Sequence, residues 1–274
     1  MYHAKRALPE NWDVELMLRD RRGSKFVAKC RVEDKAVLKY FQRLLDSTFR
    51  KVVTRDRKGG NMPERLRLVK VTEVANNKLW ISCMARQEAI RRELRTDGKG
   101  MMMVKADTNL SEIDTTADQD GSCFSGPALD PSVNEVILFH GTIDIAAAAA
   151  ITTSDFWIYF ASSTAGTPYG RGLYLAENCS KSDEYARPEK GGNRTLLVCR
   201  TTLGHPLYTD QVSPDPRKCE DACLKGPRHS VLGDRRKCRG TFREFVIFDE
   251  EQVCASHILS YRRVPAPAKP GIET

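Results

Sequence analysis

The chain has 274 residues, of which 41% are hydrophobic and 29% charged, with 18 glycines and 13 prolines. This length fits one large domain, or one domain with a smaller appendage, and the composition excludes collagen-like, coiled-coil and fully disordered proteins. The net charge of +8 is uneven: residues 1–100 hold 25 Lys and Arg against 13 Asp and Glu, and residues 101–274 hold 19 against 23. We interpret the basic half as a solvated surface, because its charges are spread out. The alternative is a contact surface for nucleic acid or another polyanion.

Membrane and secretion signals are weak in this sequence. The longest nearly apolar run, 143–151, is too short for a transmembrane helix, and the first ten residues lack the apolar core of a signal peptide. The nine cysteines, an odd number, suit reduced thiols better than a disulfide framework. We therefore expect an intracellular protein, nuclear or cytoplasmic, with no membrane partner.

The first half of the chain predicts a short series of helices and strands. Two apolar runs within 14–32, split by a charged turn, predict a hairpin-like pair. Hydrophobic spacing then predicts a helix over 33–51, a polar turn over 54–63, a strand over 66–74 and a helix over 79–94. Residues 97–134 lack periodicity and predict a linker or a long loop.

The second half is richer in strands. Continuous apolar runs predict strands at 136–139, 172–176, 195–200, 245–249 and 258–261, and an alanine-rich helix is expected at about 144–152, with Asp144 near its N-terminus. The tail after 264 contains three prolines and is expected to fray. Because strands outnumber helices and are joined by loops, we predict an α+β fold with mainly antiparallel sheets.

Two segments contain residues that suit ligand binding. His140-Gly141-Thr142 follows a predicted strand, where a histidine can point outward and a glycine lets a ligand approach the backbone. In 166–186, three closely spaced glycines precede Tyr174 and a helix-like run in which Ser182 and Tyr185 share one face. A hydroxyl beside an aromatic ring suits a flat ring that carries an amide. The glycine spacing fits neither a dinucleotide-binding dehydrogenase nor a phosphate-loop NTPase.

Glu244 opens the apolar run 245–248 and so predicts a carboxylate at the start of a buried strand. A buried carboxylate needs either a partner or a function, since an unpaired buried charge is costly. A salt bridge to Arg243 or Arg239 is the structural alternative to a functional role. For this residue taken alone, the salt bridge is favoured.

Taken together, these motifs resemble the catalytic domain of the poly(ADP-ribose) polymerases. His140-Gly141-Thr142, the segment from Gly170 to Tyr185 and Arg243-Glu244-Phe245-Val246 occur in the family's order. The resemblance covers about 133–264 and continues faintly over 68–80. Nothing in the first 100 residues is similar to the helical regulatory domain of the DNA-damage-activated members.

The resemblance implies an ADP-ribosyltransferase fold of split antiparallel sheets, with NAD consumed as a substrate. The resemblance places the catalytic core at 133–264. Charge and composition add a basic N-terminal segment over 1–100 that belongs to the catalytic domain or packs on it, a flexible linker over 101–132 and a disordered tail over 265–274. The catalytic residues by resemblance are Glu244, His140 and Tyr174. The residues expected to bind NAD are His140, Gly141, Thr142, Gly172, Tyr174, Ala176, Lys181, Ser182 and Tyr185.

Individual roles also follow from the resemblance. His140 would bind a ribose hydroxyl on the adenosine side, and Gly141 and Ser182 would hold the nicotinamide carboxamide. Tyr185 and Tyr174 would lie on opposite sides of the nicotinamide ring. Glu244 would bind the 2′-hydroxyl of the nicotinamide ribose and polarise the acceptor.

This sequence departs from the family pattern in three places, one of which is the helix after His140, which is nearly all alanine. Cys254-Ala255-Ser256-His257 replaces an aromatic-Pro-Glu-aromatic run, and 161–168, the expected donor loop, consists mainly of small and polar residues. Some members carry zinc, but Cys219, Cys223, His229 and Cys238 have poor zinc spacing, so we expect free thiols and no metal.

The predicted function is NAD-dependent transfer of ADP-ribose to protein acceptors, with polymer formation made possible by Glu244. The alternatives are a mono-ADP-ribosyltransferase and a non-catalytic scaffold that binds NAD or ADP-ribose. A polyanion-binding protein built on the basic half is a third interpretation.

Overall fold

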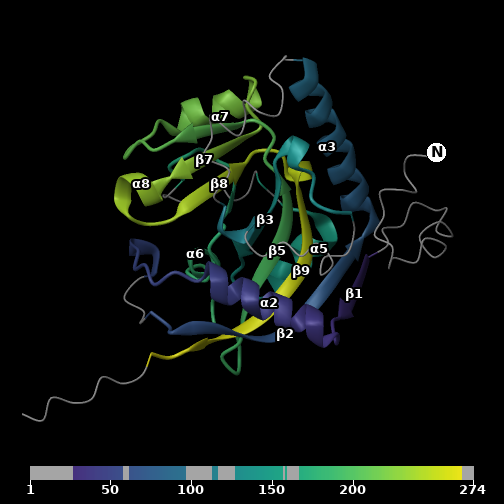
Figure 1. The fold of residues 1–274 in the computed structure, drawn as a ribbon, viewed down its shortest axis with the longest axis vertical. Helices are drawn as coiled ribbons and strands as arrows, with labels where there is room; N and C mark the ends of the chain where they lie inside the picture. Colours follow the sequence, from purple (N-terminus) through teal and green to yellow (C-terminus); the bar gives the residue numbers. More distant parts are fainter. Residues whose placement is uncertain are drawn as a thin grey trace, which may run out of the picture.

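The computed structural model describes residues 27–57, 62–96, 113–116, 127–156, 158 and 167–266. These residues form two β-sheets flanked by helices (Figure 1), which confirms the predicted α+β class. None of the described helices is long and apolar enough to span a bilayer. The first run of the predicted hairpin, residues 161–166 of the donor loop and most of the C-terminal tail lie outside the described residues.

The larger sheet has five antiparallel strands in the order β1-β2-β9-β5-β3. Their bounds are β1 Val27–Arg31, β2 Arg65–Asn76, β9 Val253–Val264, β5 Arg194–Thr202 and β3 Glu135–Gly141. Strands from both ends of the chain therefore share one sheet. β9 is much longer than the predicted 258–261, because its first half is buried without the polar alternation that marks a surface strand.

The smaller sheet has four strands in the order β4-β8-β7-β6. They are β4 Leu173–Leu175, β8 Arg243–Ile247, β7 Ser230–Asp234 and β6 Pro206–Thr209. β6 and β7 run parallel, and the other pairs are antiparallel. The parallel pair is possible because helix α7, Pro216–Leu224, lies in the connection between the two strands.

One backbone bridge joins the two sheets. The N–H of Phe139 in β3 donates to the carbonyl of Ala176 at 2.7 Å, and the N–H of Ala176 donates to the carbonyl of Phe139 at 3.0 Å. Ala176 directly follows β4, so this bridge fixes the end of β3 beside the start of the smaller sheet.

The predicted helices are present with modest changes in length. α2 spans Lys35–Thr48, α3 Asn77–Thr96 and α5 Ile145–Ser154. Asp34 and Asp144 cap α2 and α5 by accepting hydrogen bonds from backbone N–H groups. Two short helices follow, α6 Cys179–Ser182 and α8 Arg235–Arg239, and the 3₁₀ turns are η2 Arg55–Arg57, η4 Asp114–Thr116, η6 Pro131–Val133 and η8 Glu250–Gln252.

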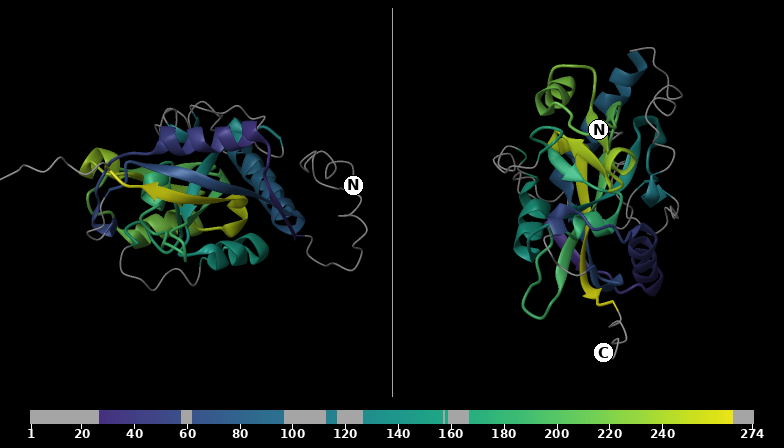
Figure 2. Two further views of the ribbon diagram at one scale, coloured as in Figure 1. Left: turned by 90° about the horizontal axis from the view of Figure 1, so that it is seen from below. Right: turned by 90° about the vertical axis from the view of Figure 1, so that its left-hand side faces the viewer.

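Alternating residues of β3 divide the core between two helices. Ile137 and Phe139 pack with α2 on one face of the five-stranded sheet, whereas Val136 and Leu138 pack with Ala148 of α5 on the other. The left view of Figure 2 shows α2 above this sheet and α5 below it. The α5 side of the core also takes in residues of β4 and β8, so it holds the two sheets together.

Parts of the predicted linker contact the fold. In η4, the Thr115 hydroxyl donates to the carbonyl of Ile137 at 2.7 Å, and the Asp114 N–H donates to Glu177 at 2.7 Å. Further along, Pro127 accepts a hydrogen bond from the buried Arg200 side chain, which also pairs with Glu135. The described parts of 101–132 are thus attached to both β3 and β5.

We expect Leu259→Ala to lower the free energy of unfolding by about 3 kcal/mol, because a fully buried leucine would leave a cavity in the central strand β9. Chemical denaturation monitored by circular dichroism measures the change. Leu224→Ala makes the same truncation on a side chain that is 57% exposed, and it should change stability little. Equal losses in the two variants would contradict the assignment of β9 to the core.

Candidate active site

The predicted site residues come from four elements that meet where the two sheets are bridged. His140 and Gly141 end β3, Tyr174 lies in β4 and Glu244 lies in β8. The turn that begins with α6 supplies the others. β4 pairs with β8 so that Tyr174 lies opposite Val246, two residues from Glu244 on the same strand.

The His140 ring is held in one orientation. Its Nδ1 lies 3.1 Å from the carbonyl oxygen of Tyr174, and its ring meets Phe156 edge-on at 5.3 Å. Burial lowers the pKa of His140, although the bond to Tyr174 opposes this, so the ring is neutral near pH 7. A neutral ring that donates through Nδ1–H leaves Nε2 as a hydrogen-bond acceptor.

Tyr174 is anchored at its hydroxyl. The hydroxyl donates to the carbonyl of Gly170 at 3.0 Å and accepts from the N–H of Tyr169 at 3.1 Å. The two tyrosine rings lie 6.5 Å apart, and burial raises the pKa of both, reinforced by the charge of Glu244. Gly172 permits this arrangement, because a Cβ there would come within 2.6 Å of the Val246 side chain.

Gly141 lets the end of β3 lie directly against the α6 turn. A Cβ at this position would be 2.1 Å from the carbonyl oxygen of Ser182, which no side chain tolerates. The Ser182 hydroxyl is buried and donates to the carbonyl of Phe139 at 3.0 Å. Beyond Ser182, the N–H of Tyr185 donates to the Ser182 carbonyl, so the short helix continues as a tight turn.

Two other predicted binding residues have structural contacts. The Thr142 hydroxyl donates to the carbonyl of Asp144, the residue that caps α5, and the Ala176 backbone makes the bridge to β3. Both residues are buried. Their role in binding NAD stays a prediction.

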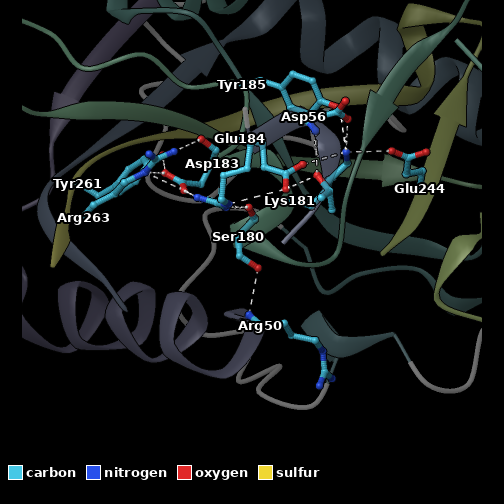
Figure 3. Close-up of polar contacts among 12 residues, drawn as sticks. Arg50, Asp56, Ser180, Lys181, Asp183, Glu184, Tyr185, Glu244, Tyr261 and Arg263 are labelled. Carbon is cyan, nitrogen blue, oxygen red and sulfur yellow. Dashed lines mark hydrogen bonds and ion pairs between the residues drawn. The ribbon is translucent and has the colours of Figure 1, made fainter. Parts of the chain in front are cut away.

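Lys181 connects Tyr185 to Glu244. Its ammonium nitrogen lies 2.9 Å from the Tyr185 hydroxyl, 3.0 Å from Glu184 Oε2 and 3.3 Å from Glu244 Oε1. Figure 3 shows these side chains converging on the ammonium group. Burial alone lowers the pKa of Lys181, but the neighbouring carboxylates, Glu244 foremost, raise it above its usual value, so the group stays charged. Tyr185 and Glu244 therefore lie in the same cluster.

The carboxylate of Glu244 is held at one oxygen only. Oε1 contacts Lys181, while Oε2 is buried and has no hydrogen-bond partner within the described part of the chain. Arg243, one of its two expected partners, instead makes a buried bidentate pair with Glu177 at 2.6 and 2.7 Å. Because Glu177 lies two residues before α6, this pair ties β8 to the α6 turn. The salt bridge to Arg243 or Arg239, the structural alternative for Glu244 taken alone, is wrong. Neighbouring side chains of a β-strand point to opposite faces, which separates Arg243 from Glu244, and Arg239 instead donates to the carbonyl of Val212.

Sequence reasoning missed the segment 50–57, which contacts the α6 turn along its length. Arg57 is 1% exposed in its side chain and donates to Asp183 at 3.0 Å and to the Ser180 carbonyl at 2.8 Å. Thr54 donates to Glu184 at 2.6 Å, and the Arg50 N–H donates to the Ser180 hydroxyl. No local sequence pattern marks these residues, because their partners are more than 120 positions away.

The Asp183 carboxylate is the buried centre of this attachment. Besides Arg57, it accepts hydrogen bonds from the Tyr261 hydroxyl at 2.7 Å and from Arg263 Nε at 2.9 and 3.0 Å. Three donor side chains from two segments, η2 and β9, thus fix one carboxylate between α6 and Tyr185. Because these donors compensate the buried charge of Asp183, the carboxylate holds its segment in a single position.

The family departure at 254–257 lies in β9, away from the cluster of Lys181. Cys254 packs with Trp80 and Cys83 of α3, and the His257 ring lies 4.7 Å from the Phe41 ring. Burial lowers the pKa of His257 to about 4. The replacement therefore changes packing between the larger sheet and helices α2 and α3.

The possible zinc ligands have other contacts. His229 Nε2 lies 2.8 Å from Glu93, Cys219 is buried and the Cys238 thiol faces the Gln211 carbonyl. Over the residues that the structure describes, no group of three or more His, Cys, Asp or Glu side chains is arranged to hold a metal ion.

Residues 49–263 match the family described as the poly(ADP-ribose) polymerase catalytic domain. The chain belongs to this family. It is also 34% identical over 111 residues to a poly(ADP-ribose) polymerase tankyrase of Caenorhabditis elegans, a match that covers 37% of this chain and 5% of the relative. The chain thus spans a small part of the length of that relative, whereas the family match begins at residue 49 and so takes in the segment 50–57.

We expect Arg57→Met to lower the free energy of unfolding by about 3 kcal/mol, because it leaves the buried Asp183 without one of its partners. Arg55→Met is the matched control, since Arg55 is an exposed neighbour in the same 3₁₀ turn. Urea denaturation of both variants measures the difference. An Arg57 variant as stable as the Arg55 control would contradict a structural role for the Arg57 pair.

Proposed function

We propose that this protein is an NAD-dependent ADP-ribosyltransferase that cleaves the nicotinamide–ribose bond and transfers ADP-ribose to protein acceptors. Polymer formation is the favoured form of the activity, and transfer of a single unit is the alternative. The family supports the general class. The observation that carries the proposal for this chain is Glu244, whose Oε2 is buried without a partner while Oε1 is held by Lys181.

A ribose hydroxyl suits the open oxygen of Glu244. A buried carboxylate oxygen with no donor raises the free energy of the folded protein, and a ligand hydroxyl would remove that cost. As the glycosidic bond breaks, its electron pair leaves with nicotinamide, which becomes neutral, and positive charge grows on the ribose. A fixed carboxylate beside the ribose stabilises this charge chiefly in the transition state. An acceptor nucleophile then bonds to the ribose carbon and releases its proton.

The remaining residues would orient NAD. The rings of Tyr185 and Tyr174 offer flat faces for nicotinamide, and Gly141 and Ser182 would hold its carboxamide. The Ser182 hydroxyl can accept from the carboxamide while it donates to Phe139, since a hydroxyl has one donor and two acceptor sites. His140 Nε2 would accept a hydrogen bond from the adenosine ribose.

The alternatives differ in what they require of the site. A non-catalytic scaffold for NAD or ADP-ribose would not need the three residues His140, Tyr174 and Glu244, all of which this chain retains. A separate proposal is that the basic N-terminal part contacts nucleic acid or another polyanion. We also propose that the protein acts inside the cell, in the nucleus or the cytoplasm. A steep loss of nucleic-acid affinity with added salt would support the polyanion proposal.

We expect Glu244→Gln to lower the rate of NAD consumption by about 100-fold or more and to abolish polymer growth, because it removes the charge that stabilises the transition state while it keeps the shape of the side chain. Release of nicotinamide from labelled NAD, and gel analysis of labelled protein, measure the two effects. Glu251→Gln, an exposed glutamate after the same strand, is the control and should leave both unchanged. Long ADP-ribose polymers made by the Glu244 variant would refute this role of Glu244. A wild type that neither releases nicotinamide nor labels protein would refute the proposed enzymatic activity.

The pH dependence of NAD use tests His140. Because burial lowers its pKa below the ordinary 6.5, the ring stays neutral as the pH falls from 8 to 6.5. We therefore expect KM for NAD to be constant over that range and to rise at lower pH, where protonated Nε2 can no longer accept a hydrogen bond. The folded state also loses stability there, since the unfolded chain binds the proton more readily, so circular dichroism must accompany the assay. A large rise in KM between pH 8 and 6.5 would contradict this assignment.

A further inference from the structure

Asp56 reaches the site from a part of the chain that carries none of the recognised motifs. Its Oδ2 accepts from the Tyr185 hydroxyl at 2.8 Å and from Lys181 Nζ at 2.9 Å. The Lys181 ammonium in turn donates to the Tyr185 hydroxyl at 2.9 Å. These three polar atoms form a closed triangle at the tip of the Tyr185 side chain (Figure 3).

The triangle fixes a ring that packing alone leaves loosely held. Tyr185 is 47% exposed, and the Lys181 ammonium lies 4.9 Å from the centre of its ring. A half-exposed aromatic side chain loses rotamer freedom when a ligand stacks on it, and this loss weakens binding. Because Asp56 and Lys181 hold the hydroxyl beforehand, less freedom is lost when a flat ring binds.

Asp56 also shares the ammonium on which Glu244 depends. Lys181 has three N–H donors but four oxygen neighbours, on Asp56, Glu184, Tyr185 and Glu244. Its distance to Glu244, 3.3 Å, is the longest of the four. Asp56 thus competes with Glu244 for the same protons.

We propose that Asp56 is a positioning residue for the nicotinamide end of NAD, which holds the Tyr185 ring in place and draws the Lys181 ammonium away from Glu244. This inference rests on the proposed function. Asp56 remains charged at neutral pH: burial raises its pKa, but Lys181 and Tyr185 outweigh burial and lower it below the usual value. The residue acts through Tyr185 and Lys181, and the 50–57 segment places it there.

The test compares Asp56→Ala with the matched control Glu64→Ala in the full chain. Glu64 is an exposed carboxylate of the same basic N-terminal part, and it pairs with Lys51 at 2.6 Å, away from the triangle. Isothermal titration with nicotinamide gives the affinity of the site, and steady-state assays give KM and kcat for NAD. We expect Asp56→Ala to weaken nicotinamide binding about fivefold, as loss of a partly exposed charge-assisted hydrogen bond predicts, and to raise KM similarly. Glu64→Ala should change neither.

A double-mutant cycle with Tyr185→Phe separates positioning from general damage. Tyr185→Phe removes the hydroxyl that donates to Asp56, one of the two partners of this carboxylate, and should reproduce most of the loss in nicotinamide affinity. In the Tyr185→Phe background, Asp56→Ala should then weaken binding by less than about twofold. Independent, multiplicative losses would overturn the proposal, as would an Asp56 variant indistinguishable from the Glu64 control.

The outcomes also separate this inference from the proposed function. If the wild type binds nicotinamide and consumes NAD, and Asp56→Ala has the same nicotinamide affinity and the same KM, the positioning role is wrong but the proposed enzymatic function is supported. If the wild type neither binds nicotinamide nor consumes NAD, both fail. Thermal melting accompanies every measurement, and a loss of affinity that only follows a loss of folded protein counts against the proposal.

Discussion

The rest of the site depends on the ion pair between the buried ammonium group of Lys181 and the carboxylate of Glu244. This ammonium group is the single described cation within 4 Å of Glu244, and it binds Tyr185 and Glu184 as well. One positive charge thus faces three carboxylates, on Asp56, Glu184 and Glu244, and cannot neutralise all of them. The arrangement leaves an excess of negative charge, which suits the proposed substrate NAD, because its nicotinamide ring is positive and its ribose would become more positive as the bond breaks.

The two sheets put these groups together by backbone contacts. The bridge between Phe139 and Ala176 sets the end of β3 against β4, and Gly141 lets β3 touch the turn that contains Ser182. β8, the strand of Glu244, begins at Arg243. The buried pair of Arg243 with Glu177 then fixes this start of β8 beside the α6 turn. Each candidate site residue on these strands therefore lies within two residues of a contact that fixes its segment.

Sequence patterns predicted the local features well, because helices and buried strands depend on neighbouring residues. The amphipathic spacing around Phe41 gave α2, and the apolar run through Leu138 gave β3. The motifs also predicted His140, Tyr174 and Glu244 as site residues, and the structure places these three on adjoining strands. The pairing of Glu244 with Lys181, and the attachment of 50–57 to the α6 turn, could not be predicted, since both join residues far apart in the chain through side chains that have no periodic signal. Both strands of the parallel pair, β6 and β7, were missed, because four and five residues are too few for a clear pattern.

Two features of the site lower the stability of the fold, and the buried ion pairs of Asp183 beside them offset this loss. Glu244 Oε2 without a donor and a half-exposed Tyr185 are features that folding alone does not favour. Both lie next to Lys181, whose turn is fastened by the buried Asp183 to Arg57, Tyr261 and Arg263. A carboxylate that takes donors from an N-terminal segment and from the last strand joins both ends of the described chain at this turn. The N-terminal segment 50–57 therefore helps to hold the turn that bears Lys181, together with the last strand, β9.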